Sequence, residues 1–372
     1  MSAAPATTVS DRAVLDLKGL EADNLLAFVA LLGLLRALET AQPVWAPRVS
    51  WHQPPWTARL HLAASVDEAG LAQAANAGIE RIADALAPLG HELHAVEMAA
   101  PAPTKGKSSA RNTRTTNSSI ADEKGVKDIW NVNFRPRLYR DLAAGCGDQA
   151  VAGLLLAALA GEHPVGREGY VAVSPYVLTR GQGHQRFLED VFAMLSVDPP
   201  AGKGLAAADR ILEIVRALFQ SWRRAEARGG FRWDPVEDRR HALRFREPSK
   251  EGARTEIGAM RLAAAGFLSM MTCPAGRNLV TKGVVRTAAN ELYFVWPLWT
   301  VPLTREAIEV LLGHPAVLTE HPDPRWLVAL GVAEVMRAAR VRAGKYTSIG
   351  RGEPTCGSGV PTSLAPPSRS TH

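Results

Sequence analysis

The stretch LKGLEADNLLAFVALLGLLRAL, residues 17–38, contains the most apolar run near the N-terminus. Either Asp23 or Asn24 is expected to cap a helix, because both side chains accept hydrogen bonds from the first backbone amides of a helix. Beyond the cap, leucine, valine and phenylalanine cover nearly the whole circumference of the predicted helix. Such a helix packs deep inside a domain or between two subunits. Its apolar part, Leu25–Leu38, is shorter than the ~20 residues that span a bilayer, so we expect a buried helix and no membrane segment.

Short strands and a second helix are predicted on either side of this stretch. Val14–Leu17 has the apolar alternation of a short strand. Arg48–Trp51 and Ala58–Leu62 predict a hairpin around a proline-containing turn. The S-x-x-E sequence at residues 65–68 is a capping box, which predicts the start of an amphipathic helix. We expect Pro88 to end that helix, because proline lacks the amide that continues the hydrogen-bond ladder.

Helices and strands continue to mix through the rest of the chain. Helices are predicted at residues 148–162, 185–195, 210–228, 255–271 and 303–312, and strands at 170–178, 242–246, 280–286 and 291–298. The order shows no regular alternation of strand and helix and no internal repeat. The sequence therefore predicts an α+β fold of mixed helices and antiparallel hairpins.

The overall composition indicates a basic protein with a sizeable core. Of the 372 residues, 47% are hydrophobic, the formal net charge is +6 and the pI is about 9.4. Basic proteins attract polyanions, of which nucleic acid is the commonest in cells. The three cysteines are too widely spaced for a disulfide framework or a zinc site. We expect a cytoplasmic protein with no membrane partner.

A basic loop is predicted between two folded parts. From 101 to 127 the composition shifts to Ser, Thr, Asn, Lys and Arg, and Lys105, Lys107, Arg111 and Arg114 precede any acid. This stretch is expected to be disordered, either as a solvated linker or as an arm that orders on phosphates. It separates an N-terminal α+β part, residues 1–100, from a main α+β part, residues 128–348. A Gly/Pro/Ser/Thr tail, 349–372, is expected to be disordered.

Aromatic residues alternate with arginines directly after the loop. The aromatics are Trp130, Phe134 and Tyr139, and the arginines are Arg135, Arg137 and Arg140. This pattern suits stacking on bases combined with contacts to phosphates. A surface strand with ordinary exposed arginines explains it as well.

Further candidates for nucleic-acid contact come from a glycine-flanked turn and from a basic pair. Gln182 lies between two glycines, which permit a tight backbone path beside another molecule. His184 could act as an acid or base, although docking of this turn on a neighbour explains it without catalysis. With Arg186, Arg239 and Arg240 these residues complete the predicted nucleic-acid-binding set.

Catalytic motifs are absent, and two weak candidates for metal binding remain. The phosphate-binding loop, dinucleotide fingerprint, H-E-x-x-H and G-x-S-x-G patterns do not occur. His91 and His94 have ligand-like spacing within a predicted loop but no acid-rich partner motif. Asp234, Glu237 and Asp238 could hold Mg²⁺ for phosphodiester cleavage. A helix cap with ion pairs explains these acids better, so we expect a chain with no catalytic residue, metal or cofactor.

Five segments together resemble proteins of type I-G CRISPR–Cas loci, formerly called I-U. The match covers about residues 17–346 and is most distinctive in the W-D-P-x-E-D-R-R run. The segments are LKGLEADNLLAFVALLGLLRAL (17–38), GQGHQRFL (181–188), FRWDPVEDRRHAL (231–243), GAMRLA (258–263) and FVWPLW (294–299). They are similar to a large-subunit-like family and to a family regarded as an extension of the signature helicase–nuclease. Leu25 stands where that family has proline, and Met260 where it has asparagine.

This resemblance implies a role in RNA-guided DNA interference. Protein subunits of such assemblies hold nucleic-acid backbones while guide pairing reads the sequence. The expected protein is a non-catalytic subunit or adaptor that contacts DNA, guide RNA, other CRISPR–Cas subunits or the helicase–nuclease. A metal-dependent nuclease that uses Asp234, Glu237 and Asp238, and a scaffold that touches only protein, remain the alternatives.

Overall fold

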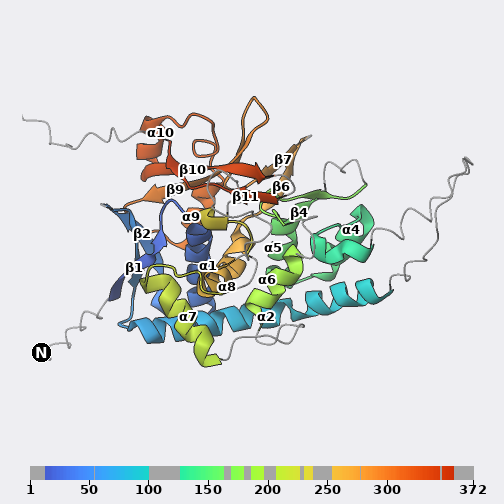
Figure 1. Ribbon diagram of the computed structural model, residues 1–372, viewed down its shortest axis with the longest axis horizontal. Helices are drawn as coiled ribbons and strands as arrows, with labels where there is room; N and C mark the ends of the chain where they lie inside the picture. Colours follow the sequence, from blue (N-terminus) through green and yellow to red (C-terminus); the bar gives the residue numbers. More distant parts are fainter. Residues whose placement is uncertain are drawn as a thin grey trace, which may run out of the picture.

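The computed structural model describes residues 13–53, 55–99, 126–162, 169–179, 186–196, 207–226, 230–237, 254–276, 278–343 and 346–355 (Figure 1). The helices are α1 (Leu25–Ala41), α2 (Glu68–Ala99), α4 (Pro136–Gly145), α5 (Ala150–Leu159), α6 (Phe187–Leu195), α7 (Ala207–Phe219), α8 (Ile257–Gly266), α9 (Arg305–Leu312) and α10 (Pro324–Ala329). Short 3₁₀ helices are η1 (Pro43–Trp45), η2 (Val126–Asn131), η3 (Pro235–Glu237) and η5 (Phe267–Ser269).

Strand pairs within the described residues are all antiparallel, which confirms the predicted α+β class. A three-stranded sheet has the order β1-β3-β2, and a larger one has the order β11-β10-β9-β8 with β12 beside β10. The strands are β1 (Ala13–Glu21), β2 (Arg48–His52), β3 (Thr57–Leu62), β4 (Ala160–Gly161), β5 (Ala172–Val173), β6 (Thr272–Ala275), β7 (Asn278–Thr281), β8 (Val284–Arg286), β9 (Leu292–Trp299), β10 (Val332–Ala343), β11 (Tyr346–Ile349) and β12 (Glu353–Pro354).

Helix α1 lies at the centre of the molecule and is buried almost throughout, as its all-round apolar sequence predicts. The larger sheet covers it from above in Figure 1, and α2 and α7 lie below. It crosses α8 at very short range. A Cβ atom on Gly33 would overlap the backbone of Leu262, and one on Gly266 would overlap the backbone of Val29. The two glycines therefore set the distance between these helices.

The sequence predicted the position of several elements correctly. Asn24 caps α1, since its Oδ1 accepts from the amides of Leu26 at 3.0 Å and Ala27 at 3.5 Å. The predicted hairpin is β2 and β3. The strands expected at 280–286 and 291–298 appear as paired β8 and β9, preceded by β7.

Helix α2 corrects the prediction that Pro88 ends it, because it continues to Ala99. Leu89 and Leu93 beyond the proline are buried and extend the apolar stripe of the earlier turns. Their burial outweighs the single backbone hydrogen bond that proline removes. The helix also begins at Glu68 and is capped by Asp67 rather than by Ser65, since Asp67 Oδ1 accepts from the Gly70 amide at 2.8 Å.

The C-terminal segment corrects the boundary expected for the tail. Residues 349–355 are placed, and they contain the end of β11 and all of β12. The Gly352 amide donates to the Asp23 carbonyl at 2.7 Å, and Arg351 pairs with Asp23 at 2.6 Å. The amino-acid composition of the tail does not reveal these contacts with residues far away in the chain. Residues 356–372 lie outside the described residues.

Other expected boundaries also change. Only β5 forms within the strand expected at 170–178, and α7 ends at Phe219 rather than near 228. The strand expected at 242–246 and residues 101–125 of the basic loop lie outside the described residues, whereas Val126 begins η2. One apolar cluster draws side chains from Leu17 to Ile349, so both predicted α+β parts contribute to it.

Candidate functional site

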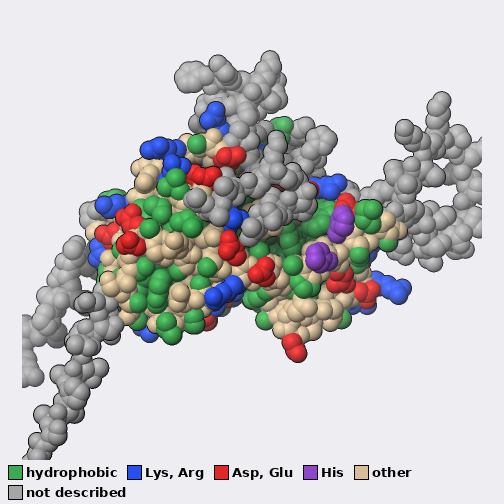
Figure 2. All heavy atoms as spheres, turned by 90° about the horizontal axis from the view of Figure 1, so that it is seen from below, with side chains coloured by type: hydrophobic (Ala, Val, Ile, Leu, Met, Phe, Trp, Pro, Cys, Tyr) green, Lys and Arg blue, Asp and Glu red, His purple; other side chains and the backbone are tan. Residues whose placement is uncertain are grey.

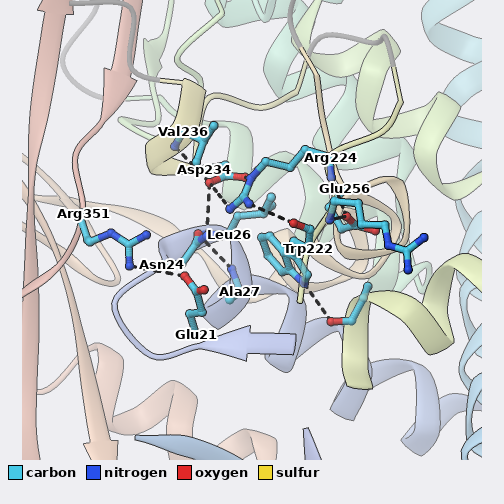
Figure 3. Close-up of polar contacts among 12 residues, drawn as sticks. Glu21, Asn24, Leu26, Ala27, Trp222, Arg224, Asp234, Val236, Glu256 and Arg351 are labelled. Atoms are coloured by element: carbon cyan, nitrogen blue, oxygen red, sulfur yellow. Dashed lines mark hydrogen bonds and ion pairs between the residues drawn. The ribbon is translucent and has the colours of Figure 1, made fainter. Parts of the chain in front are cut away.

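The acid of the distinctive W-D-P-x-E sequence, Asp234, lies at the centre of a buried polar hub. Its Oδ1 accepts from Asn24 Nδ2 at 3.3 Å, Arg224 Nη2 at 3.2 Å and the Val236 amide at 3.2 Å. Its Oδ2 accepts from Arg224 Nε at 2.7 Å. Figure 3 shows these donors converging on the carboxylate from three separate segments. We call Asn24, Arg224 and Asp234 the Asp234 hub.

An unusual backbone holds the arginine of this hub in place. Arg224 has φ +49° and Arg232 has φ +68°, the left-handed region that side chains other than glycine rarely adopt. Each such residue costs about 1 kcal/mol or more, which the surrounding contacts must offset. Glu256 Oε2 accepts from the amides of Arg223 and Arg224, both at 3.0 Å. Burial raises the pKa of Glu256.

Beside the hub, Glu237 forms a second buried ion pair. Its Oε2 lies 3.5 Å from Arg232 Nη1, and both side chains are about 4% exposed. Burial raises the pKa of Glu237 to about 7, although the nearby Arg232 opposes the shift. A Cβ atom on Gly230 would overlap this carboxylate, so Gly230 makes room for it. The pair is a buried contact within the described part of the chain.

Trp233 supports a corner of the core, where it is fully buried. Its indole Nε1 donates to the Tyr176 carbonyl at 2.9 Å. Its ring packs on Phe231 and Phe267, with centroid distances of 4.7 and 5.6 Å. Trp233 and Phe231 are therefore fully buried, and no face of this tryptophan is available to a base.

The acid cluster behaves as a cap rather than as a metal centre in its described part. Asp234 caps η3 through the Val236 amide, but Glu237 turns to Arg232 instead of reaching back as a capping-box glutamate would. Asp238 lies outside the described residues. Where side chains are described, no group of three or more His, Cys, Asp or Glu could hold a metal ion.

His91 and His94 lie on α2 and not in a loop, because that helix continues past Pro88. His94 Nδ1 is 4.0 Å from Glu97. The Glu97 carboxylate is already engaged elsewhere, since it accepts from Trp130 Nε1 at 2.7 Å and from Arg186 Nη1 at 3.3 Å. The histidine pair thus gains no acidic ligand from this neighbour.

Four members of the predicted nucleic-acid-binding set are described, and each has a partner within the chain. Arg135 lies 4.3 Å from the ring centroid of Tyr170. Arg140 pairs with Glu162 at 2.8 Å, Arg137 with Asp141 at 3.8 Å and Arg186 with Glu97 at 3.3 Å. The others, Lys105, Lys107, Arg111, Arg114, Gln182, His184, Arg239 and Arg240, lie outside the described residues.

The aromatics interleaved with these arginines face the core. Phe134 is fully buried, and Trp130 is 9% exposed. Tyr139 donates its hydroxyl to the Ala160 carbonyl at 2.9 Å. The segment from Pro136 is helix α4 rather than the surface strand we considered, because Pro136 occupies the first turn of a helix, where its missing amide is not needed. Neither Phe134 nor Trp130 is positioned to stack on a base.

A small hollow of about 60 Å³ lies beside the hub, between the end of α7 and the start of α8. Its lining carries charges of both signs, from Glu213, Arg216, Arg223, Glu226 and Glu256. On the underside of the molecule, Figure 2 shows basic and acidic side chains interspersed among apolar ones.

Sequence reasoning missed the hub because its members are far apart in the chain. Asn24 and Asp234 are separated by 210 positions, and Arg224 belongs to no recognised pattern.

A scan against family models and searches of curated proteins and of solved structures gave no match. No helix in the described ranges is long and apolar enough to cross a membrane.

Proposed function

We propose that this chain is a non-catalytic subunit or adaptor of a type I-G CRISPR–Cas interference complex. It would work in the cytoplasm and contact nucleic acid, the helicase–nuclease or both. The observation that carries the proposal is that the described parts of the five family-like segments pack on one another in the core of the fold, with two of them joined at the Asp234 hub.

The contacts between these segments are direct. Asn24 of the 17–38 segment donates to Asp234 of the 231–243 segment at 3.3 Å. Trp296 of the 294–299 segment donates its Nε1 to the Ala22 carbonyl at 2.8 Å. Phe187 of the 181–188 segment packs on Phe231, with a centroid distance of 5.4 Å.

The fifth segment, 258–263, lies in α8 and packs against α1 at the glycine crossing. Residues that carry the resemblance thus serve one another as packing and hydrogen-bonding partners. This is the pattern expected if the likeness reflects a shared scaffold rather than a shared active site.

A non-catalytic role fits the state of Asp234. Its two carboxylate oxygens accept four hydrogen bonds from three residues, and the residue is 2% exposed. A metal ion bound there would have to displace the Arg224 pair, which is costly because it would strand a largely buried guanidinium. The nuclease alternative therefore needs a different acid set.

Co-elution with the other proteins of a type I-G locus tests the assembly. The full chain, tagged, is expressed together with those subunits and a guide RNA and is then passed over a size-exclusion column. We expect it to elute within the complex and to leave labelled DNA intact in Mg²⁺ when purified alone. A folded Asp234→Ala variant that loses a Mg²⁺-dependent cleavage activity would favour the nuclease, and co-elution without nucleic-acid binding would favour the scaffold.

A further inference from the structure

Three arginines lie close together on one face of the larger sheet. Arg286 pairs in register with Leu292, and Ala339 pairs with Tyr293, so continuing the register by one residue places Leu292 beside Arg340. Arg340 is in turn opposite Ile349 on β11. Residues opposite one another across antiparallel strands point to the same side of a sheet.

Arg342 lies on the same side, because it is two residues beyond Arg340 on β10. Arg286, Arg340 and Arg342 are all exposed at the end of the sheet. We call these three residues the arginine face. None of them belongs to the nucleic-acid-binding set predicted from the sequence.

The charges of the arginine face are not neutralised by the described part of the chain. No described carboxylate lies within ion-pair distance of Arg340, Arg342 or Arg286. Arg286 Nη1 donates to Asn290, at 2.8 Å to Oδ1 and 3.4 Å to the carbonyl, and both acceptors are uncharged. Partial burial lowers the pKa of Arg340, and repulsion from Arg342 and Arg286 lowers it further.

This differs from other arginines of the protein. Arg305 contacts Glu39, Glu306 and Glu309, and Arg351 contacts Glu21 and Asp23. The three like charges of the arginine face repel one another, and a bound anion would relieve that repulsion.

The backbone positions of the arginine face are spread over the end of the sheet. Two strand spacings separate Arg286 from Arg340, about 10 Å, and two residues along a strand separate Arg340 from Arg342, about 7 Å. Guanidinium groups bind phosphate oxygens with paired hydrogen bonds. A chain of phosphates offers each of these arginines a partner of its own.

We infer that the arginine face binds the phosphate backbone of a nucleic acid. The inference rests on the proposed function for the identity of its partner, and it names the surface through which the subunit makes that contact. Phosphate contacts position a protein without reading sequence, which suits a complex whose guide RNA does the reading.

The test compares two charge-matched triple variants of the full chain. R286Q/R340Q/R342Q removes the arginine face, and K18Q/R48Q/R325Q removes three exposed charges elsewhere. Binding to fluorescein-labelled single-stranded DNA, duplex DNA and RNA is followed by anisotropy over a salt series, and circular dichroism checks the fold of each variant.

We expect the arginine-face variant to bind at least tenfold more weakly at about 100 mM salt. Its plot of log K against log salt on duplex should be shallower by about 2 to 3, because each lost phosphate contact reduces the slope by about 0.9. The affinity of the control variant should stay within about threefold of that of wild type, since removing charges elsewhere changes only the long-range electrostatic potential of the protein.

Equal binding by the two folded variants would overturn the inference while leaving the proposed function intact. A variant that keeps its nucleic-acid affinity but no longer co-elutes with the other subunits would show a protein contact instead, and would also overturn it. Loss of nucleic-acid binding in a chain that never co-elutes would support the arginine face and contradict the proposed complex.

Discussion

Asn24 Nδ2 lies 3.3 Å from Asp234 Oδ1, and the two residues are 210 positions apart in the chain. The same Asn24 side chain caps α1 through its Oδ1. One side chain therefore fixes the start of the central helix and ties it to the hub, which makes Asp234 a structural residue.

Replacing Asp234 with alanine should destabilise the fold strongly. Arg224 would lose its buried partner, and removing one member of a buried ion pair costs about 3–5 kcal/mol. Urea denaturation measures this directly. Asp141→Ala, which removes the exposed partner of Arg137, is the matched control and should change the free energy of unfolding by less than about 1 kcal/mol. Equal effects of the two substitutions would contradict a structural hub.

Gly33→Ala should destabilise the protein because the added methyl group has no room. It would overlap the backbone of Leu262, which cannot move without shifting α8. Overpacking of this kind costs about 1–3 kcal/mol, and more when only backbone can yield. Gly153→Ala, in α5, provides the control, since nothing lies within 4 Å of its added Cβ. It should stabilise by up to about 1 kcal/mol, because alanine favours helix.

Glu237 should make stability depend on pH in a definite direction. Burial raises the pKa of Glu237 from 4.5 to about 7. The folded chain therefore binds this proton more tightly than the unfolded chain, so stability falls as pH rises from about 4.5 to about 7. Outside that window the contribution of this residue is constant. A shift of this size corresponds to about 3 kcal/mol.

Glu237→Gln removes this titration. The free energy of unfolding of both proteins is measured by thermal or urea denaturation from about pH 4.5 to 8. Over this range the stability of the variant relative to wild type should increase by up to about 3 kcal/mol, because only wild type loses stability through the Glu237 proton. Glu353→Gln, which replaces an exposed carboxylate on β12, is the matched control. Parallel profiles for wild type and Glu237→Gln would show that Glu237 does not titrate in this range.

Glu309 joins α9 to α1 through a shielded ion cluster. It accepts from Arg36 at 3.0 Å and from Ser269 at 2.7 Å, and it pairs with Arg305. Despite burial, these donors lower the pKa of Glu309. Glu309→Ala should cost about 3–5 kcal/mol, because it leaves the Arg36 and Arg305 charges in each other's field.

Glu306→Ala is the control for that cluster. Glu306 contacts the same Arg305, but its side chain is 63% exposed. Its removal should change the free energy of unfolding by about 0.5 kcal/mol or less.

The contribution of Glu309 should also disappear on acidification, since a carboxylate with a lowered folded pKa stabilises only above its unfolded pKa and loses that effect as pH falls. If Glu309→Ala and Glu306→Ala lower the free energy of unfolding equally, the burial of Glu309 does not determine how much the ion cluster stabilises the protein.

The sequence predicted those features that depend on neighbouring residues. A cap at Asp23 or Asn24, the hairpin of β2 and β3 and the buried character of α1 each follow from a few adjacent side chains. The passage of α2 through Pro88 was mispredicted, because the burial of Leu89 and Leu93 depends on what packs against them. β12 was missed for a related reason, since a two-residue strand is recognised only by its pairing with β10.

The candidate site shows the same limit more sharply. The acids at 234 and 237 were recognised from their spacing, but Arg224 and Asn24, which neutralise and orient Asp234, are set by tertiary structure. The arginine face needs the register of β8, β9 and β10 before its members can be seen as neighbours. Local pattern therefore identifies candidate residues, and strand pairing identifies which of them act together.

The most direct test of the central claim is anisotropy of labelled duplex DNA, single-stranded DNA and RNA with the full wild-type chain, over a salt series and with Mg²⁺ present. The proposed function predicts binding that weakens linearly in log K against log salt, while the labelled strand stays intact. Absence of binding to all three, or cleavage that a folded Asp234→Ala variant abolishes, would contradict a non-catalytic subunit that contacts nucleic acid.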